Sequence, residues 1–384
     1  MKVDIGVRRR LVALIENVSH GKATADPADS FLPVTPLRSP MSGWTAEEMP
    51  RLDGKTAVVT GANSGLGYEG TRAFAAKGAT VVMACRSVER GEDAADKIRA
   101  EAGGGNGDSD SDGDLDVREC DLASLDSVTG FADGLADDYD AVDVLCNNAG
   151  VMAIPRSETE DGFETQFGVN HLGHFALTGR LFSLLRDAEG VDGEARIVTQ
   201  SSGAHESGEM DFSDLNWEES YGKWKAYGRS KLANLLFAYE IQRRIDAANR
   251  EGDAPIDIRS VACHPGYADT NLQLRTAAES GNPLMKVGMR LANAVLGQDA
   301  ATGALPMLYA ATADVDGGAY VEPGGLMNMR GHPTIGRSND ASYNSEDASR
   351  LWEYSTEAAG VEFPFKASAG APRLLINGER SALV

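Results

Sequence analysis

A short glycine-rich segment between a predicted strand and a predicted helix limits the fold of this chain more than any other feature. The strand TAVVT runs directly into Gly61-Ala-Asn-Ser-Gly65-Leu-Gly67, and then into YEGTRAFAAKG, which has helical periodicity and ends at Gly78. Glycines there let the backbone approach a pyrophosphate, whose charge is stabilised by free N–H groups and the helix dipole. The order of strand, turn and helix therefore predicts a βαβ unit that binds a dinucleotide.

The chain beyond Lys55 continues to alternate β-rich runs with helix-length segments. The runs are TAVVT, TVVMA, LDVREC, VDVLCNN, ARIVTQ and IDIRSVAC. Further on, NLQLRTAAESGNPLMKVGMRLANAV predicts a lid followed by a helix, TGALPMLYAATA another helix, and GAYVEPGG a last strand and turn. We predict an α/β fold: a single Rossmann-type doubly wound domain, with a mostly parallel seven-stranded sheet and helices on both faces.

Segments at both ends and one internal loop differ from this pattern. Residues 1–40 are predicted to form a flexible extension. One alternative is that IGVRRRLVALIENV forms a docking or membrane-surface helix. A second alternative is that translation starts at Met41. Residues 41–365 form the predicted nucleotide-binding domain. Within it, the Gly/Ser/Asp tract at about 102–114 predicts a solvated loop, since its spacing does not match a calcium-binding EF-hand. Residues 366–384 form a C-terminal tail.

The charge of the chain limits its partners. The sequence has 36 basic and 58 acidic residues, for a formal net charge of −22. This balance disfavours nucleic acid or an anionic membrane as a partner because like charges repel. The acid excess extends beyond the acidic loop into the helices, which indicates adaptation to concentrated salt, where screening tolerates dense carboxylates. Ordinary acidity from a few loops is the alternative.

The cysteines and histidines form no pattern typical of a metal site. His171 and His174 lack the acid and the third ligand of a zinc motif, so we expect them to pack or cap. No apolar stretch reaches the roughly 18 residues that a membrane span requires. We predict a soluble cytoplasmic protein with no metal and no integral membrane segment. The cysteines are scattered singly and predict reduced core residues: Cys85, Cys120, Cys146 and Cys263.

The ends of the next three strands suggest which nicotinamide cofactor binds. Arg86 follows the second strand, a position where an NAD-selective enzyme usually has an acidic residue. A guanidinium can pair with the 2′-phosphate of NADP(H). Arg86 therefore favours NADP(H) as the cofactor, with NAD(H) as the alternative. Asp121-Leu122 follows the third strand, where the carboxylate either accepts from the adenine amino group or caps the helix beginning near Ser124. Asn148-Ala149-Gly150 closes the fourth, where small residues let a ribose approach the backbone.

A tyrosine and a lysine at helical spacing predict the chemistry. Tyr227 and Lys231 share one helix face, so both can act on one ligand. A tyrosine with a pKa of about 10 needs a nearby cation to act as an acid or base near neutral pH. Ser202, after ARIVTQ, is expected to hold the substrate oxygen beside the phenol. Tyr221 and Lys225 have the same spacing, but Tyr227 leads into an uninterrupted helix, so we choose the second pair.

Together these residues resemble the short-chain dehydrogenase/reductase family, whose TG-x-x-x-G-x-G, N-N-A-G, Ser, Y-x-x-x-K and P-G motifs occur here in the expected order over roughly residues 53–335. The resemblance implies that Asn170 holds a water in a proton relay to Lys231, and that Lys231 binds the ribose hydroxyls. The cofactor-binding positions that we predict are Gly61, Asn63, Ser64, Gly65, Leu66, Gly67, Arg86, Asp121, Leu122, Asn148, Ala149, Gly150, Tyr227, Lys231, Pro265, Gly266 and Thr270.

Four segments are similar to the retinol dehydrogenase and protochlorophyllide reductase-like branch: ACRS, VNHLGHFALTG, SSGAHESGEMDFSDLNW and SKLANLLFA. Trp217 and Trp224 in this region are expected either to wall an apolar pocket or to pack at the surface. The resemblance also implies a homodimer or homotetramer built on the helix beginning at Tyr227.

The function that the sequence favours is hydride transfer between NADP(H) and a hydrophobic alcohol or carbonyl, with tyrosine as the proton donor or acceptor. A catalytically silent NADP-binding regulatory protein is one alternative, which the complete set of Asn170, Ser202, Tyr227 and Lys231 disfavours. A sugar-nucleotide epimerase or dehydratase is another, and the absence of an obvious extended substrate domain disfavours it.

Overall fold

The computed structural model describes residues 43–103, 113–252, 255–266, 299–325 and 328–366. The predicted N-terminal extension, most of the acidic loop, the predicted lid and nearly all of the tail lie outside these residues, as does Thr270. Within them, no helix is both long enough and apolar enough to cross a membrane.

The described strands form one sheet in the order β3-β2-β1-β4-β5-β6-β7-β8. Neighbouring strands from β3 to β7 are parallel, and β8 is antiparallel to β7. The strand order reverses between β1 and β4, which is where ligands bind in open α/β sheets. The strands are β1 (Thr56–Thr60), β2 (Thr80–Cys85), β3 (Leu115–Glu119), β4 (Val144–Asn147), β5 (Ala195–Gln200), β6 (Ile258–Cys263), β7 (Tyr320–Pro323) and β8 (Pro333–Gly336).

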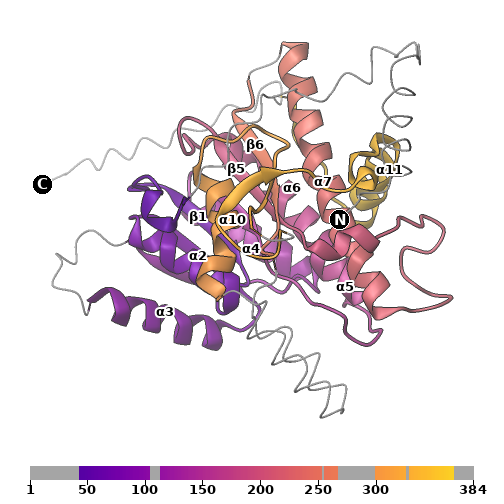
Figure 1. The fold of residues 1–384 in the computed structure, drawn as a ribbon, viewed down its shortest axis with the longest axis horizontal. Helices are drawn as coiled ribbons and strands as arrows, with labels where there is room; N and C mark the ends of the chain where they lie inside the picture. Colours follow the sequence, from indigo (N-terminus) through magenta and orange to yellow (C-terminus); the bar gives the residue numbers. More distant parts are fainter. Residues whose placement is uncertain (1–42, 104–112, 253–254, 267–298, 326–327, 367–384) are drawn as a thin grey trace, which may run out of the picture. The chain divides into compact units, whose positions relative to one another are not determined.

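Helices cover both faces of the sheet, so the predicted doubly wound α/β fold is confirmed (Figure 1). The sheet has one strand more than predicted, because the four-residue β8 is too short to show a periodic pattern. The α-helices are α2 (Gly65–Ala76), α3 (Val88–Gly103), α4 (Leu125–Asp138), α5 (Thr165–Phe167), α6 (Gly173–Arg186), α7 (Lys223–Glu251), α10 (Ala300–Thr312) and α11 (Ser345–Ala359). Shorter turns are η2 (Ala46–Glu48), η4 (Gly168–Leu172, a π-helix), η5 (Gly203–Ser207) and η7 (Asp340–Tyr343).

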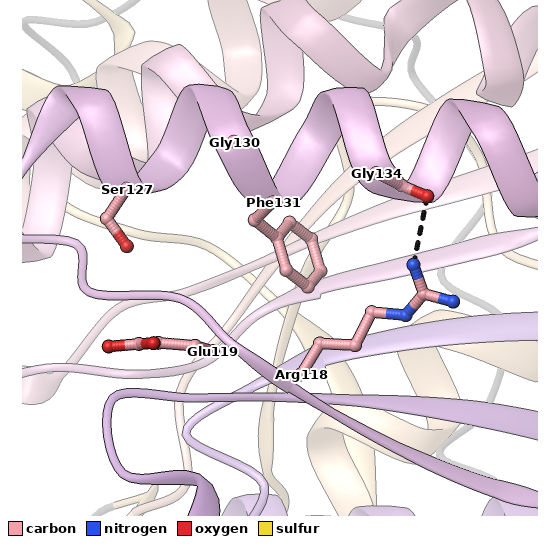
Figure 2. A pocket seen from close by; sticks show the side chains of 6 residues that line it. All are labelled: Arg118, Glu119, Ser127, Gly130, Phe131 and Gly134. Carbon is pink, nitrogen blue, oxygen red and sulfur yellow. Dashed lines mark hydrogen bonds between the residues drawn. The ribbon is translucent and has the colours of Figure 1, made fainter.

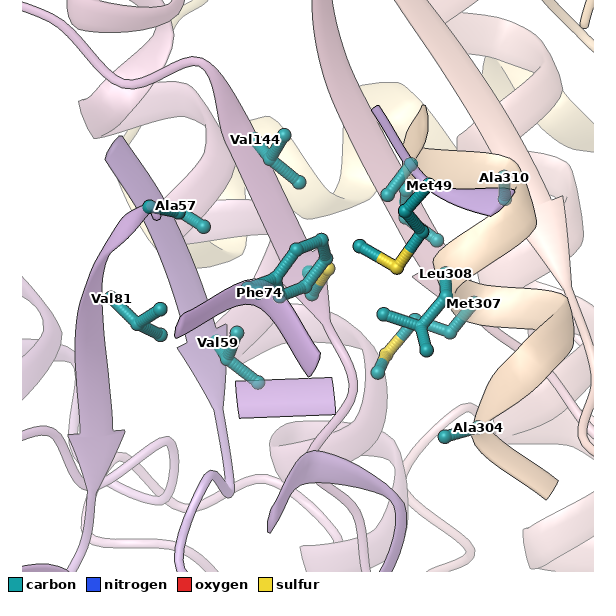
Figure 3. Close-up of a cluster of buried hydrophobic side chains, with 14 of the residues drawn as sticks. Met49, Ala57, Val59, Phe74, Val81, Val144, Ala304, Met307, Leu308 and Ala310 are labelled. Carbon is teal, nitrogen blue, oxygen red and sulfur yellow. The ribbon is translucent and has the colours of Figure 1, made fainter. Parts of the chain in front are cut away.

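Alternate residues of each strand enter opposite cores. Val59 of β1 lies in a cluster with Phe74 of α2 and Met307 of α10, whereas its neighbour Val58 belongs to the core on the other face. Figure 3 shows Phe74 and Met307 directed into the first cluster. This period-two alternation, with both faces buried, is why the strands read as nearly continuous apolar runs.

Aromatic side chains join α11 to α6 and α7. The rings of Phe175 and Trp352 are 5.1 Å apart, and Phe237 stacks on Trp352 at 6.1 Å. Phe363, just after α11, lies 4.6 Å from Trp352 and 5.1 Å from Phe175. The middle of α7 therefore packs against the same chain's C-terminal helix (Figure 1).

One predicted helix start was wrong, and one of the two roles considered for Asp121 is excluded. α7 begins at Lys223, so Tyr227 lies in its second turn rather than at its start. The helix α4 is capped by Ser124, whose hydroxyl accepts from the backbone N–H of Ser127, and not by Asp121. The Asp121 carboxylate instead accepts from the backbone N–H of Ala123 at 3.0 Å, because it lies four residues ahead of the helix.

Candidate active site

A cavity of about 750 Å³ opens at the carboxyl ends of the strands, where the strand order reverses. Residues from distant parts of the chain line it together: the turn after β1, the ends of β2 to β6, and the first turns of α7. The predicted residues in its lining are Gly61, Asn63, Ser64, Gly65, Leu66, Gly67, Arg86, Asp121, Leu122, Asn148, Ala149, Gly150, Ser202, Tyr227, Lys231, Pro265 and Gly266.

The glycine turn leaves no room for side chains. Gly61 has a φ of +68°, a left-handed conformation that favours glycine. A Cβ added at Gly67 would lie 2.4 Å from the Gly61 carbonyl oxygen and 2.7 Å from Nδ2 of Asn148. Ser64 precedes α2 at the N-cap position but its side chain makes no capping hydrogen bond, and the first turn carries no acidic residue. The first backbone N–H groups of α2 are therefore free to bind a phosphate. The turn from Gly61 to Gly67, here called the cofactor cradle, thus fits a dinucleotide.

The far end of the cavity is basic. Arg86, after β2, is joined in the lining by Arg90 and Lys97, which lie on the helix α3. Asp93 of the same helix also lines the cavity. The sequence prediction included Arg86 alone, because Arg90 and Lys97 stand in a charged helix that reads as a solvated face. Arg90 and Lys97 are seven residues apart, about two helical turns, and this spacing is the signal that places both on one face of α3.

Hydrogen bonds join the ends of β1 and β4 beneath the cofactor cradle. The Thr60 hydroxyl accepts from the backbone N–H groups of Asn148 and Ala149, both at 2.9 Å. The Asn148 amide donates to the Thr60 carbonyl at 2.8 Å. His174 lies 2.9 Å from the same hydroxyl through Nε2, and burial lowers the pKa of His174 to about 4. The role of His174 is thus structural, as predicted.

Tyr227, Ser202 and Lys231 meet at one wall of the cavity. The Tyr227 phenol is buried; burial raises its pKa, and a hydrogen bond with Ser202 lowers it. The Lys231 ammonium lies 6.0 Å from the centre of the Tyr227 ring and donates to the Gln200 carbonyl at 3.0 Å. Burial lowers the pKa of Lys231 to about 8. A phenol, a hydroxyl and a buried amine therefore face one space.

Asn170 lies behind this wall, within the π-helical turn η4. Its Oδ1 accepts from the Val151 N–H at 2.8 Å, and its Nδ2 donates to the Val151 carbonyl and to the Ser230 hydroxyl, each at 2.9 Å. A Cβ added at Gly150 would lie 3.0 Å from the Asn170 Oδ1 and 3.6 Å from the Lys231 Nζ. Asn170 is thus near Lys231, with its side-chain amide used by the protein itself.

Tyr221, the alternative tyrosine, is held in a structural network. Its hydroxyl donates to the Ile154 carbonyl at 2.9 Å and accepts from the Gln166 amide at 2.7 Å. Its partner in sequence, Lys225, is exposed. Burial raises the pKa of Tyr221 above its ordinary value. Neither residue lines the cavity, so the geometry favours Tyr227.

The two tryptophans considered for the substrate wall have different surroundings. Trp224 is 52% exposed, lines the cavity and meets the Tyr227 ring edge-on at 6.4 Å. Trp217 is buried beneath the guanidinium of Arg229, which lies 4.0 Å above its ring. Trp224 is thus an apolar part of the cavity lining, as is Met152, which the sequence analysis did not identify.

A second hollow, of about 330 Å³, lies between β3 and α4 and contains none of the predicted site residues (Figure 2). There Arg118 donates to the Gly134 carbonyl at 2.9 Å and pairs with Asp116 and Asp138. Its charge is thus neutralised locally. Among the residues that the structure describes, no group of three or more His, Cys, Asp and Glu side chains is arranged to hold a metal ion.

Comparison with known proteins agrees with this arrangement. The model of the short chain dehydrogenase family matches residues 55–280. The chain belongs to the short chain dehydrogenase family. Members of this family are NAD(P)-dependent oxidoreductases, so the family resemblance predicted from the motifs is confirmed.

Retinol dehydrogenases are among the relatives. Retinol dehydrogenase 14 of Mus musculus is 47% identical over 223 residues, which are 58% of this chain and 63% of the mouse protein. Retinol dehydrogenase 13 of Homo sapiens is 35% identical over 342 residues, 88% of this chain and 94% of the human protein. The predicted retinol dehydrogenase-like branch is therefore confirmed.

A solved structure supports the same fold. An uncharacterized protein from Mycobacterium paratuberculosis is 39% identical, with a TM-score of 0.66; the match covers 84% of this chain and all of that one.

Proposed function

We propose that this protein transfers hydride between NADP(H) and a hydrophobic alcohol or carbonyl compound. The observation that carries the proposal is one cavity lined at one end by the glycine turn and a basic cluster, and at the other by Ser202, Tyr227 and Lys231. When bound, the cofactor supplies or accepts the hydride. The chain's own residues bind and orient both ligands and move the proton.

The basic end of the cavity supports a preference for NADP(H). Arg86, Arg90 and Lys97 line the cavity together with two acids, Asp93 and Asp121. The 2′-phosphate carries about two negative charges, and guanidinium groups bind such an anion through charge-assisted hydrogen bonds. NAD(H) offers only a hydroxyl there, so it loses these contacts.

Tyr227 is the proposed proton donor in the reductive direction. As the carbonyl carbon gains hydride, the phenol O–H gives its proton to the carbonyl oxygen, and oxidation reverses this transfer. Burial in the protein alone raises the pKa of Tyr227, which favours the neutral, proton-donating form. The Ser202 hydroxyl stabilises the phenolate that remains and holds the substrate oxygen beside it.

Lys231 and Asn170 support this step. The Lys231 ammonium lies within reach of the Tyr227 ring and favours a developing negative charge on the phenol. We propose that Lys231 also binds the ribose hydroxyls, and that Asn170 supports the relay that returns a proton to Lys231. The Asn170 side-chain amide is bonded to Val151 and Ser230, and its backbone carbonyl accepts from the His174 Nδ1 at 3.0 Å. Pro265 and Gly266 border the nicotinamide end, and we assign Thr270 there by its motif alone.

The proposed substrate is a long apolar alcohol or aldehyde. Trp224 and Met152 give the cavity lining apolar surface, and an exposed tryptophan there is suited to a flat or extended hydrocarbon. The retinol dehydrogenases among the relatives suggest retinal as the first compound to assay.

We also propose a cytoplasmic enzyme that associates as a homodimer or homotetramer. Around Phe237, α7 is covered by Trp352 and Phe363 of the same chain, so self-association through α7 would use other parts of that helix.

The test is a fluorescence titration with NADPH and with NADH in high salt, followed by turnover of retinal and a panel of aldehydes. We expect tighter binding of NADPH and substrate-dependent oxidation of NADPH. Tight binding without turnover of any carbonyl or alcohol would instead favour a regulatory NADP-binding protein, and no binding of either cofactor would refute the proposal.

A further inference from the structure

A buried histidine stands directly behind Ser202. His205 lies in the η5 turn that Ser202 begins, and it is 2% exposed. Its Nδ1 is 2.7 Å from the Ser202 carbonyl oxygen. On the other side of the ring, the backbone N–H of Asn339 points to Nε2 at 3.4 Å, and the Asn339 amide donates to the His205 carbonyl at 3.1 Å.

These partners determine which ring nitrogen carries the proton. A carbonyl oxygen can only accept, so Nδ1 must be protonated to bond Ser202. A backbone N–H can only donate, so Nε2 must be unprotonated to bond Asn339. Neutral His205 in the Nδ1–H form satisfies both, and the imidazole connects the Ser202 turn to the segment around Asn339.

That segment is itself firmly held. Ser338 shares hydrogen bonds with Tyr239 at 2.8 Å and with Ser342 at 2.6 Å, and Asn339 caps η7 by accepting from the Ser342 N–H. Tyr239 belongs to α7, the helix that also carries Tyr227. His205 therefore joins Ser202 to a hydrogen-bonded segment that is anchored on the same helix as the phenol.

The η5 turn also lies directly against α7 beside the phenol. A Cβ at Gly228, the residue after Tyr227, would be 2.9 Å from the Ala204 carbonyl oxygen. The Ser202 Oγ accepts from the Ala204 N–H at 3.3 Å, which leaves its own hydrogen free to donate. Displacing the turn would thus move the Ser202 hydroxyl relative to the Tyr227 oxygen.

We infer that His205 is a positioning residue for the reaction: in its neutral Nδ1–H form it links the Ser202 turn to Asn339 and so holds Ser202 where the hydroxyl meets the substrate oxygen. Protonation keeps the Nδ1–H bond to Ser202 but removes the Nε2 acceptor of the Asn339 N–H, which breaks that link. This inference rests on the proposed function of Ser202 and Tyr227. His205 touches neither substrate nor cofactor and acts through Ser202.

Protonation would change the partners of the ring. If Nε2 is protonated, its N–H points at the N–H of Asn339, and two donors repel each other. The Glu206 carboxylate, 3.4 Å from Nε2, would instead attract the protonated ring. The other titratable groups that face the ring are His264, Tyr320 and Glu322. Burial lowers the pKa of His205 and is the largest effect. The hydrogen bond to the Ser202 carbonyl raises this pKa, as do Glu206 and Glu322, and His264 lowers it. The neutral form therefore predominates at neutral pH, and activity should fall on the acid side.

The test measures kcat and KM from initial rates with NADPH and retinal between pH 5 and 9. We expect His205→Asn, whose amide can still donate to the Ser202 carbonyl, to keep most of kcat at pH 7.5 and to lose the acid limb of the profile. His205→Leu should lower kcat about three- to tenfold, the effect of one net hydrogen bond, with the Kd for NADPH unchanged.

A surface variant avoids any effect of core packing. Glu206→Gln removes a carboxylate that raises the pKa of His205, so the acid limb should move to lower pH. The matched control is Glu209→Gln, an equal charge change on another exposed residue, which should leave the profile unchanged. Unfolding temperatures of all variants separate stability from rate.

An acid limb that persists in His205→Asn, or that moves equally in Glu206→Gln and Glu209→Gln, would overturn the inference. So would a His205→Leu protein with unchanged kcat. If the wild type itself turns over no carbonyl, the proposed function falls instead, which distinguishes the two failures.

Discussion

Replacing Gly67 by alanine tests the cofactor cradle at its tightest point. The added Cβ would lie 2.4 Å from the Gly61 carbonyl oxygen and 2.7 Å from the Asn148 Nδ2, closer than real Cβ contacts come. Overpacking of this kind typically costs about 1–3 kcal/mol. If NADPH binding must restore the undistorted turn, its Kd rises about 5- to 140-fold, since about 1.4 kcal/mol corresponds to a factor of ten.

The assay is an NADPH fluorescence titration combined with thermal unfolding. The matched control is Gly130→Ala, a glycine in the helix α4 whose added Cβ has no neighbour within 4 Å. It should leave the Kd unchanged and stabilise the fold by up to about 1 kcal/mol through helix propensity. A Gly67→Ala protein that binds NADPH as tightly as the wild type would refute the argument that this turn approaches the cofactor.

Three further substitutions test the ends of the cavity. Arg90→Ala should weaken the binding of NADPH more than that of NADH in paired titrations, by about 1.5–3 kcal/mol for a lost charge-assisted hydrogen bond. Equal weakening of both would contradict the place of Arg90 at the 2′-phosphate. For Lys231, with a pKa of about 8 against an ordinary 10.5, the ammonium is lost as pH rises through 8. Above that pH kcat/KM should fall. The free energy of unfolding, measured with urea, should rise, because the unfolded chain still binds the proton that the folded chain has lost. Lys231→Met should remove this rise of stability with pH, and a rise that persists in the variant would contradict the assignment. Trp224→Ala should raise the KM for retinal about 2- to 12-fold without changing the unfolding temperature; an unchanged KM would place the substrate elsewhere.

The parts of the fold that the sequence predicts are those with strong local patterns. The strand TAVVT and the glycine turn that follows it became β1 and the start of α2, because buried parallel strands and tight turns allow few residue types. The helix in TGALPMLYAATA and the strand in GAYVEPGG likewise appear as α10 and β7. The chain order of these elements was sufficient to predict a doubly wound sheet.

What the sequence analysis missed depends on contacts between distant segments. One partner of His205, Asn339, lies 134 residues away, so no local pattern reveals that contact. Arg90 and Lys97 look like ordinary solvated charges until α3 is placed beside the cavity. Aromatic packing of Trp352 and Phe363 onto α7 likewise becomes visible only in the folded chain.

The central claim is that Tyr227 carries the proton, and the most direct measurement compares two single-oxygen deletions, Tyr227→Phe and Tyr221→Phe. Both tyrosines begin a Tyr-x-x-x-Lys sequence, but only Tyr227 lines the cavity. Single-turnover oxidation of NADPH with saturating aldehyde should fall by at least about a hundredfold in Tyr227→Phe. Tyr221→Phe should retain the wild-type rate per folded molecule, and both variants should bind NADPH. Wild-type turnover by Tyr227→Phe, or a selective loss in Tyr221→Phe, would contradict the account.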